Sequence, residues 1–148
     1  MKLDDKGYQL IAGFEGLSLV PYLCSAKVPT IGYGNTFYPS GIKVTMKDKA
    51  ITKETALWML KQTADKFAVQ VDSLIKSNVN QNQFNAITSL AYNIGIGGLQ
   101  RSSLLKKVNV NPNDPTITNS FLIWNKAGGI TNNGLTKRRT KEAQLYFS

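Results

Sequence analysis

The sequence contains no histidine among its 148 residues. This absence excludes Ser-His-Asp and Cys-His catalysis, and it removes the commonest metal ligand in proteins. There is one cysteine, so the chain cannot form an internal disulfide and its fold does not depend on an oxidising compartment. No apolar run approaches the roughly 20 residues that a membrane-spanning helix needs. The first 14 residues carry acids too early, and too short an apolar run, for a signal peptide.

Negative charge is also scarce, because nine Asp and Glu stand against 18 Lys and Arg, for a formal net charge of +9 at pH 7. Such a charge indicates either a solvated basic surface or an anionic polymer as partner, such as nucleic acid or the bacterial wall. The bases are scattered and do not alternate with aromatic residues, so a nucleic-acid-binding module is only weakly supported. The apolar share of 42% predicts one globular domain with a genuine core.

The order of helical and strand-like segments predicts an α+β fold with two lobes and a cleft between them. A short helix is expected at 4–14, with Asp4 as its N-cap. Proline and glycine then punctuate short β-rich runs from 17 to about 45, which predicts a small sheet of hairpins. A long helix over 51–77, with Thr52 as its N-cap and a length of roughly 35–40 Å, is expected to join this sheet to a helical lobe. Further helices are expected at 81–93, 102–109, about 115–126 and 135–147.

Only three glutamates occur, and two of them have an evident structural explanation. Glu54 suits the first turn of the long helix, and Glu142 lies among basic residues as a helix-face partner. Glu15 lies where the first helix meets the glycine- and proline-rich segment, beside Phe14. It is either a solvated residue at a helix end or the acid of an active site. A carboxyl group in a partly apolar cleft can keep its proton near neutrality, as a general acid must.

Cys24 and Thr30 follow this glutamate in the segment 14-FEGLSLVPYLCSAKVPTIGYGNT-36. A lone cysteine is most often a small buried apolar residue, and a threonine that opens a strand reflects ordinary β propensity. Together with Glu15, however, the three polar groups could face one cavity. They would supply an acid, a soft base or nucleophile, and a hydroxyl able to hold water.

This segment resembles the catalytic segment of the phage-type lysozymes, glycoside hydrolase family 24. The family pattern is Glu, eight residues, Asp or Cys, five residues and Thr, followed by a TIGYG-like run, and this chain meets that spacing without a gap. Three further segments are similar to the family: 83-QFNAITSLAYNIGIGG-98, 102-SSLLKKVN-109, and 124-WNKAGG-129 leading to 134-GLTKRRTKE-142. The resemblance implies a single lysozyme-like domain over 1–148, with a β lobe at about 15–50. The helical lobe would comprise about 51–148 and the N-terminal helix.

The resemblance also implies a reaction, the cleavage of the β-1,4 bond between N-acetylmuramic acid and N-acetylglucosamine in peptidoglycan. Glu15 takes the position of the acid that protonates the leaving oxygen. Cys24 takes that of the second group, usually an aspartate, and Thr30 that of the hydroxyl that positions the attacking water. In the inverting scheme two carboxylates flank the bond. A thiol with an ordinary pKa of ~8.5 would have to be shifted, or act otherwise, to replace one of them.

Four more residues in family-like segments are expected to face the cleft and bind substrate: Tyr33, Asn93, Arg138 and Arg139. For the double arginine, a salt bridge toward Glu15 and plain solvation on the helix face remain equally open.

The chain departs from the family pattern at three positions. Asn35 replaces a histidine found in many members, at a position that looks structural, so its effect is expected on stability. Lys27 and Pro29 replace a glycine and a bulky residue before the threonine, and they are expected to change the tip of the hairpin.

These observations predict a monomeric, endolysin-like muramidase that needs no metal or cofactor. It would stay in the host cytoplasm until the membrane is permeabilised and then attack the wall from the periplasm. The missing second carboxylate keeps open a lytic transglycosylase, which needs one acid/base glutamate and no hydrolytic water. A catalytically inactive wall-binding or spore-type domain on the same fold is also open, and so is a nucleic-acid-binding module.

Overall fold

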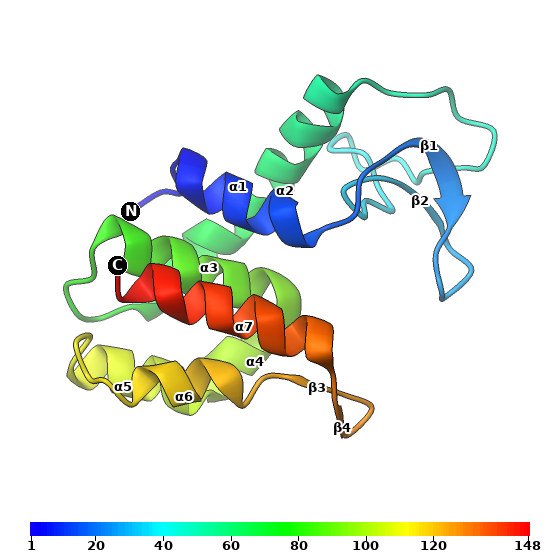
Figure 1. Ribbon diagram of the computed structural model, residues 1–148. Helices are drawn as coiled ribbons and strands as arrows, with labels where there is room; N and C mark the ends of the chain where they lie inside the picture. Colours follow the sequence, from blue (N-terminus) through cyan, green and yellow to red (C-terminus); the bar gives the residue numbers. More distant parts are fainter.

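Two antiparallel strands, β1 (Ser18–Leu23) and β2 (Pro29–Gly32), form the sheet of the smaller lobe in the computed structural model, which describes residues 1–148. Two isolated bridges, Ile31 with Asn35 and Phe37 with Lys43, extend this irregular β segment along the chain. The small sheet of hairpins expected between 17 and 45 is therefore confirmed. Figure 1 shows this lobe set apart from the bundle of helices.

The helix α2 (Lys53–Leu74) belongs to both lobes. It begins as expected, because the Thr52 side chain accepts a hydrogen bond from the backbone N–H of Thr55 at 3.1 Å. Near its start Met59 packs with two residues of the β lobe in a small core of its own. From Leu60 onward its buried side chains belong to the main core. One rigid helix therefore fixes the lobes relative to each other.

The larger lobe contains six more helices and a short second hairpin. Its elements are α1 (Asp5–Phe14), α3 (Gln81–Ile94), α4 (Ile96–Arg101), α5 (Ser103–Val110), α6 (Ile117–Leu122), β3 (Lys126–Ala127), β4 (Ile130–Thr131) and α7 (Asn133–Tyr146). The fold is thus α+β, with a small β lobe and a helical lobe joined by a long helix. No helix combines the length and the apolar content that crossing a membrane requires.

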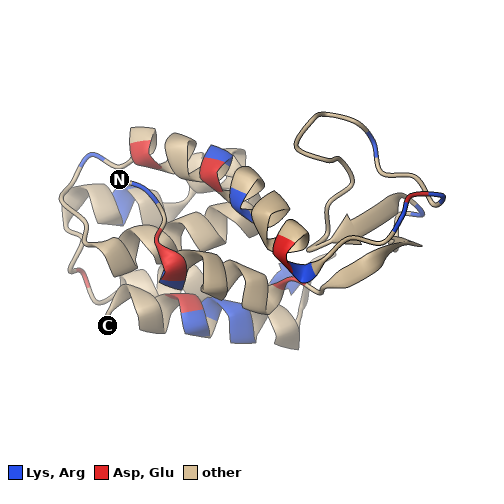
Figure 2. Cartoon of the chain, turned by 90° about the horizontal axis from the view of Figure 1, so that it is seen from above, with Lys and Arg blue, Asp and Glu red and all other residues tan.

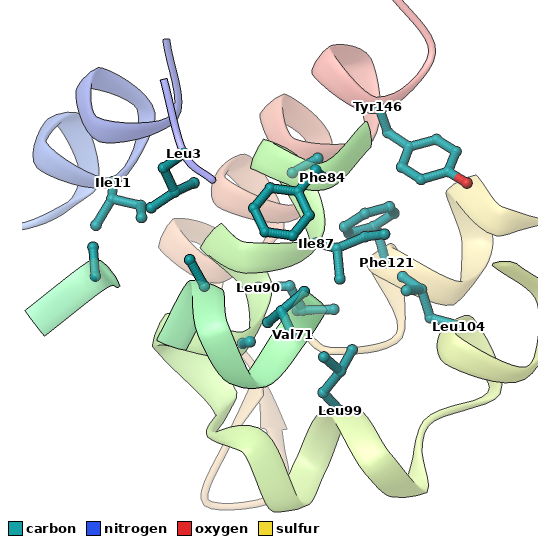
Figure 3. Packing of buried hydrophobic residues seen from close by; sticks show 14 of the residues in the cluster. Leu3, Ile11, Val71, Phe84, Ile87, Leu90, Leu99, Leu104, Phe121 and Tyr146 are labelled. Atoms are coloured by element: carbon teal, nitrogen blue, oxygen red, sulfur yellow. The ribbon is translucent and has the colours of Figure 1, made fainter. Parts of the chain in front are cut away.

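Helix α3 is the centre of the helical lobe. All nine residues from 83 to 91 are buried, and α1, α2, α4 and α7 pack around them. Figure 3 shows Phe84, Ile87 and Leu90 of this helix surrounded by side chains from several other elements. A capping box holds its start, because Asn80 and Gln83 bond to each other's backbone N–H groups. The helix therefore provides a fixed surface against which α1 and α7 are placed.

The structure differs from the sequence prediction in three connected places. The glycines of 94-IGIGG-98 end α3 as expected, but α4 starts at once, because Gly95 with φ of 87° redirects the chain instead of breaking it. Helix α6 is only six residues long, against the expected 115–126. The glycine-rich turn after it contains the β3–β4 hairpin, whose two-residue strands are too short to give a periodic signal.

Leu60→Ala is expected to lower the free energy of unfolding by about 2–5 kcal/mol, because Leu60 is completely buried in the core that α2 shares with the helical lobe. Val69→Ala on the same helix is the matched control. Val69 is 72% exposed, so its truncation should cost less than about 0.5 kcal/mol. Urea unfolding followed by circular dichroism measures both values, and similar losses for the two variants would contradict this placement of α2.

Candidate active site

Glu15 is placed by the way α1 starts and docks. The Asp4 carboxylate caps the helix by accepting from the Gly7 backbone N–H at 3.2 Å, and it also accepts from Asn85 Nδ2 of α3 at 2.7 Å. Gly7 lies so close to α3 that a Cβ there would be 2.6 Å from Asn85 Oδ1. The helix ends at Phe14, and Glu15 is its C-cap, with its backbone N–H bonded to Ile11 O. The glutamate thus stands at the junction of the lobes, as expected.

The Arg138 guanidinium of α7 holds the Glu15 carboxylate. Nη1 lies 3.0 Å from Glu15 Oε1, Nη2 donates to the Ser89 carbonyl at 3.1 Å, and Nε lies 3.4 Å from Glu142 Oε2. Its Cζ also stacks 4.7 Å above the ring of Phe14. Arg138 is 5% exposed. Of the two roles left open by the sequence, the salt bridge to Glu15 is the one that Arg138 plays.

Glu142 pairs with basic residues as expected, but it is completely buried instead of lying on a solvated helix face. Its Oε2 accepts from the Ser89 hydroxyl at 2.5 Å, and its Oε1 lies 3.2 Å from Nε of Arg139. Burial raises the pKa of the Glu142 carboxyl, which the two arginines and Ser89 oppose. Burial also lowers the pKa of Arg139 to about 10. Two carboxylates and two guanidiniums, from Glu15 to Arg139, therefore form one compact chain of alternating charge behind the cleft.

Cys24 and Thr30 come together at the end of the β1–β2 hairpin. Thr30 lies in β2 opposite Tyr22, and Cys24 directly follows β1. The Cys24 thiol is free and partly buried. Hydrogen bonds from the backbone of Val28 and Ala26, and then from the Thr30 side chain, lower the pKa of this thiol below its usual value. The Thr30 hydroxyl donates to the Val28 carbonyl at 2.9 Å.

The β lobe meets the helical lobe at Glu15. Gly34, four residues after Thr30, lies so that a Cβ would be 3.9 Å from Glu15 Oε2. One carboxylate oxygen is therefore held by Arg138, while the other faces the β segment that carries Thr30. No group of three or more His, Cys, Asp or Glu side chains that could hold a metal ion occurs in the structure.

The hairpin tip shows what the departures from the family pattern do. Lys27 adopts φ of 58°, a left-handed conformation that costs a non-glycine residue roughly 1–2 kcal/mol. Its N–H bonds to the Cys24 carbonyl at 2.8 Å, so the tight turn forms despite the side chain. Asn35 pairs through its backbone with Ile31, and its side-chain Nδ2 is 3.5 Å from Thr63 Oγ1 of α2. These contacts agree with a structural role for position 35.

Among the residues expected to bind substrate, Asn93 is exposed, whereas Tyr33 is 7% and Arg139 0% exposed. Tyr33 belongs to the main core. The Arg139 guanidinium donates to Asn93 Oδ1 and so fixes the orientation of the Asn93 amide. Both side chains are therefore largely covered by other parts of the protein, and a role for them in substrate binding stays a prediction.

Sequence reasoning did not single out Trp124, which lines a cavity with Asn93. The cavity has a volume of about 520 Å³ and is lined by Asn93, Ile94, Ile123, Trp124, Lys126 and Leu135. The indole N–H of Trp124 is buried and has no partner in the protein. The only sequence signal was the presence of this tryptophan in the family-like run 124–129. An aromatic wall beside an exposed amide suits the apolar face and the hydroxyl groups of a sugar.

Comparison with known proteins decides the family, because the sequence model described as "Phage lysozyme" matches residues 12–142. The chain belongs to the phage lysozyme family. It is 39% identical to the endolysin of Bacillus phage B103, over 100% of this chain and 55% of that protein, so it spans about half the length of this relative. It is 32% identical to the endolysin of Salmonella phage P22, over 100% of this chain and 99% of that one. Among solved structures, the endolysin from Escherichia coli O157:H7 phage FAHEc1 superimposes with a TM-score of 0.92 at 39% identity, covering 100% of this chain and 94% of that chain.

Glu142→Gln is expected to lower the free energy of unfolding by about 3–5 kcal/mol, because it leaves two buried guanidiniums in this phage lysozyme with too little negative charge. Glu54→Gln is the matched control, since Glu54 is exposed in the first turn of α2. That exchange should cost less than about 1 kcal/mol. Equal midpoints in urea for Glu142→Gln and the wild type would contradict the importance of the buried network.

Proposed function

We propose that the chain is an endolysin-like muramidase that hydrolyses the β-1,4 bonds between N-acetylmuramic acid and N-acetylglucosamine in peptidoglycan. Membership of the phage lysozyme family supports the reaction class. The observation that carries the proposal is the placement of Glu15, with one oxygen held by Arg138 and the other facing the β lobe at Gly34. An acid fixed at the junction of two lobes can act on a polymer that lies between them.

In this mechanism Glu15 donates a proton to the leaving glycosidic oxygen. Oε1 accepts from Arg138 at 3.0 Å, so Oε2 is the atom left to carry the transferable proton. Arg138 fixes the position of Glu15 Oε1, because the other two nitrogens of the guanidinium are held by Ser89 and Glu142. The Glu15 side chain, which is 25% exposed, is therefore already oriented when the substrate binds, and proton transfer needs no change of its rotamer.

Cys24 and Thr30 act on the water side of the bond. The Thr30 oxygen accepts a hydrogen bond from the attacking water, while its own proton goes to Val28 O or to the thiol. Cys24 takes the place of the second carboxylate, and its lowered pKa makes the thiolate available at lower pH than in an ordinary cysteine. The configuration of the product distinguishes a base, which gives inversion, from a nucleophile, which gives retention.

Substrate binding is assigned to Asn93, with the neighbouring cavity of Trp124 as a sugar site. Arg139 positions Asn93, Arg138 positions Glu15, and Tyr33 supports the β segment from within the core. The net charge of +9 attracts the anionic wall in a salt-dependent way.

The same proposal covers the domain, its assembly and its location. Residues 1–148 make one lysozyme domain that acts as a monomer without metal or cofactor. The protein waits in the host cytoplasm until the membrane is permeabilised, and then degrades the wall from the periplasm.

A lytic transglycosylase is the second candidate, because Glu15 has no second carboxylate as a partner for hydrolysis and a thiol stands in its place. Mass spectrometry of the released muropeptides separates the two reactions. Reducing ends support the muramidase, whereas 1,6-anhydro ends would replace it with the transglycosylase.

Glu15→Gln is expected to lower the rate of peptidoglycan cleavage at least 10²–10⁴-fold, roughly the contribution of general acid catalysis, because the amide keeps the shape but delivers no proton. The measurement is the clearing of permeabilised cells, together with the circular dichroism spectrum to verify that the variant is folded. Residual activity above a few per cent in a folded variant would remove Glu15 from the acid role.

Cys24→Ala and Cys24→Ser should each lose roughly 10²-fold or more in activity, whereas Cys24→Asp should retain much of it, because a carboxylate serves the same geometry. Iodoacetamide should inactivate the wild type. The pH midpoint of this inactivation should lie below the ~8.5 of a free thiol, since hydrogen bonds to the sulfur lower the pKa of Cys24. A fully active Cys24→Ala enzyme would leave the chemistry to Glu15 and Thr30.

A further inference from the structure

A groove is lined by residues of α1 and α7. It consists of two hollows of about 400 and 490 Å³ that share Gly13, Phe14 and Lys141. We call this surface the α1–α7 groove. The first hollow is completed by Lys6, Gln9, Leu10 and Leu145, and the second by Gly134, Thr136, Lys137, Thr140 and Gln144. The active-site mechanism above uses none of these side chains.

The charge of the α1–α7 groove has one sign. Lys6, Lys137 and Lys141 line it and are exposed, and no aspartate or glutamate is among its lining residues. Figure 2 shows the basic residues gathered on the helix that ends at the C-terminus. The Lys141 ammonium lies 5.9 Å from the centre of the Phe14 ring, at the point shared by both hollows. A ligand with carboxylate groups is complementary to this surface.

The inner end of the groove touches the candidate active site. Phe14 directly precedes Glu15 in the chain, and the guanidinium that holds Glu15 stacks on the Phe14 ring. A substituent on the sugar bound at Glu15 therefore reaches the groove without crossing the lobe. In Figure 1 α1 leads from the N-terminus toward the β lobe.

We propose that the α1–α7 groove binds the acidic peptide attached to the muramic acid residue next to the cleaved bond. This inference rests on the function proposed above, since it concerns the same substrate. The dimensions agree, because the eight helical steps from Phe14 back to Lys6 rise about 12 Å. An extended peptide of four residues spans about 13–14 Å. A short stem peptide that starts at the sugar would therefore place its carboxylates beside the lysines along the groove.

The lining favours such a peptide over a phosphate polymer. Leu10, Leu145 and Phe14 offer apolar surface, while Gln9 and Gln144 offer amide groups for a peptide backbone. A peptide with acidic and apolar side chains uses all of these groups. A polymer with one phosphate in every repeat would use the three lysines alone.

The direct test is a titration of the ¹⁵N-labelled protein with the free acidic stem tetrapeptide, followed by NMR. Amide shifts are expected at Gly13, Thr140 and Gln144, and they should be absent with the same peptide after its carboxylates have been amidated. This measurement does not depend on catalysis. If the shifts occur in a protein that cleaves no glycan, peptide binding in the groove is supported and the proposed muramidase activity is contradicted. If cleavage occurs and the peptide causes no shifts, the groove proposal is overturned.

A kinetic test uses the charge of the groove. Lys137→Gln/Lys141→Gln should lower kcat/KM about three- to tenfold on peptide-bearing glycan strands, mainly through KM, and leave it unchanged on strands whose peptides an amidase has removed. The charge-matched control is Lys66→Gln/Lys106→Gln, which changes two exposed lysines outside the groove. It should leave kcat/KM unchanged on both substrates. Equal losses on both substrates, or no loss at all, would overturn the proposal. So would a loss that disappears when phosphate polymers are stripped from walls that keep their peptides.

A steric variant tests the path of the peptide without changing charge. A side chain at Gly13 would meet no protein atom within 4 Å, so the position opens directly into the groove. Gly13→Phe should therefore lower kcat/KM on peptide-bearing strands several-fold, whereas Gly13→Ala should not, and neither should act on peptide-free strands. Equal activity of both variants on peptide-bearing strands would exclude the peptide from this path.

Discussion

The buried guanidinium of Arg138 is the contact on which the candidate site depends. It ties the end of α1, the middle of α3 and the body of α7 together through three differently directed nitrogens. A planar, always charged group with fixed donors suits this role, because it satisfies several acceptors in one geometry. Its burial is tolerated because oxygens of Glu15, Glu142 and Ser89 accept hydrogen bonds from it. The same contacts therefore stabilise the lobe and orient the Glu15 carboxyl group.

The residues proposed for the two sides of the reaction lie in two lobes with different kinds of support. Glu15 is held by helices that pack on the fully buried centre of α3. Cys24 and Thr30 lie on a two-stranded hairpin that has only a small core of its own. Helix α2 connects both, since it contributes Met59 to that small core and Leu60 to the main one. The hairpin and the helical lobe are therefore both packed against α2.

Much of this arrangement can be predicted from local signals. Asp4 and Thr52 are the expected N-caps, and the spacing of Glu15, Cys24 and Thr30 indicates the family. The burial of Glu142 cannot be predicted, because the run of charges in α7 has the pattern of a solvated helix. The pairing of Arg138 stays open in the sequence for a related reason, since the rotation of α7 against α1 is set by packing on α3. Helix α4 escapes prediction because Gly95 both ends one helix and starts the next. The roles of the site residues remain predictions, as does the division into lobes at given residues.

The close contact of Gly7 with Asn85 affects where the Glu15 carboxyl group lies. Gly7 is where α1 lies closest to Asn85 of α3, because no other residue would let the helix approach so closely. Glu15 lies eight residues further on, about 12 Å along the helix axis. If α1 tilted by about 5° about Gly7, the carboxyl group would move by about 1 Å. A displacement of that size can lower the rate of a reaction roughly 10²-fold. The position of the Glu15 carboxyl group thus depends on the packing near the other end of α1, where Gly7 has no side chain to hold the helix away from Asn85.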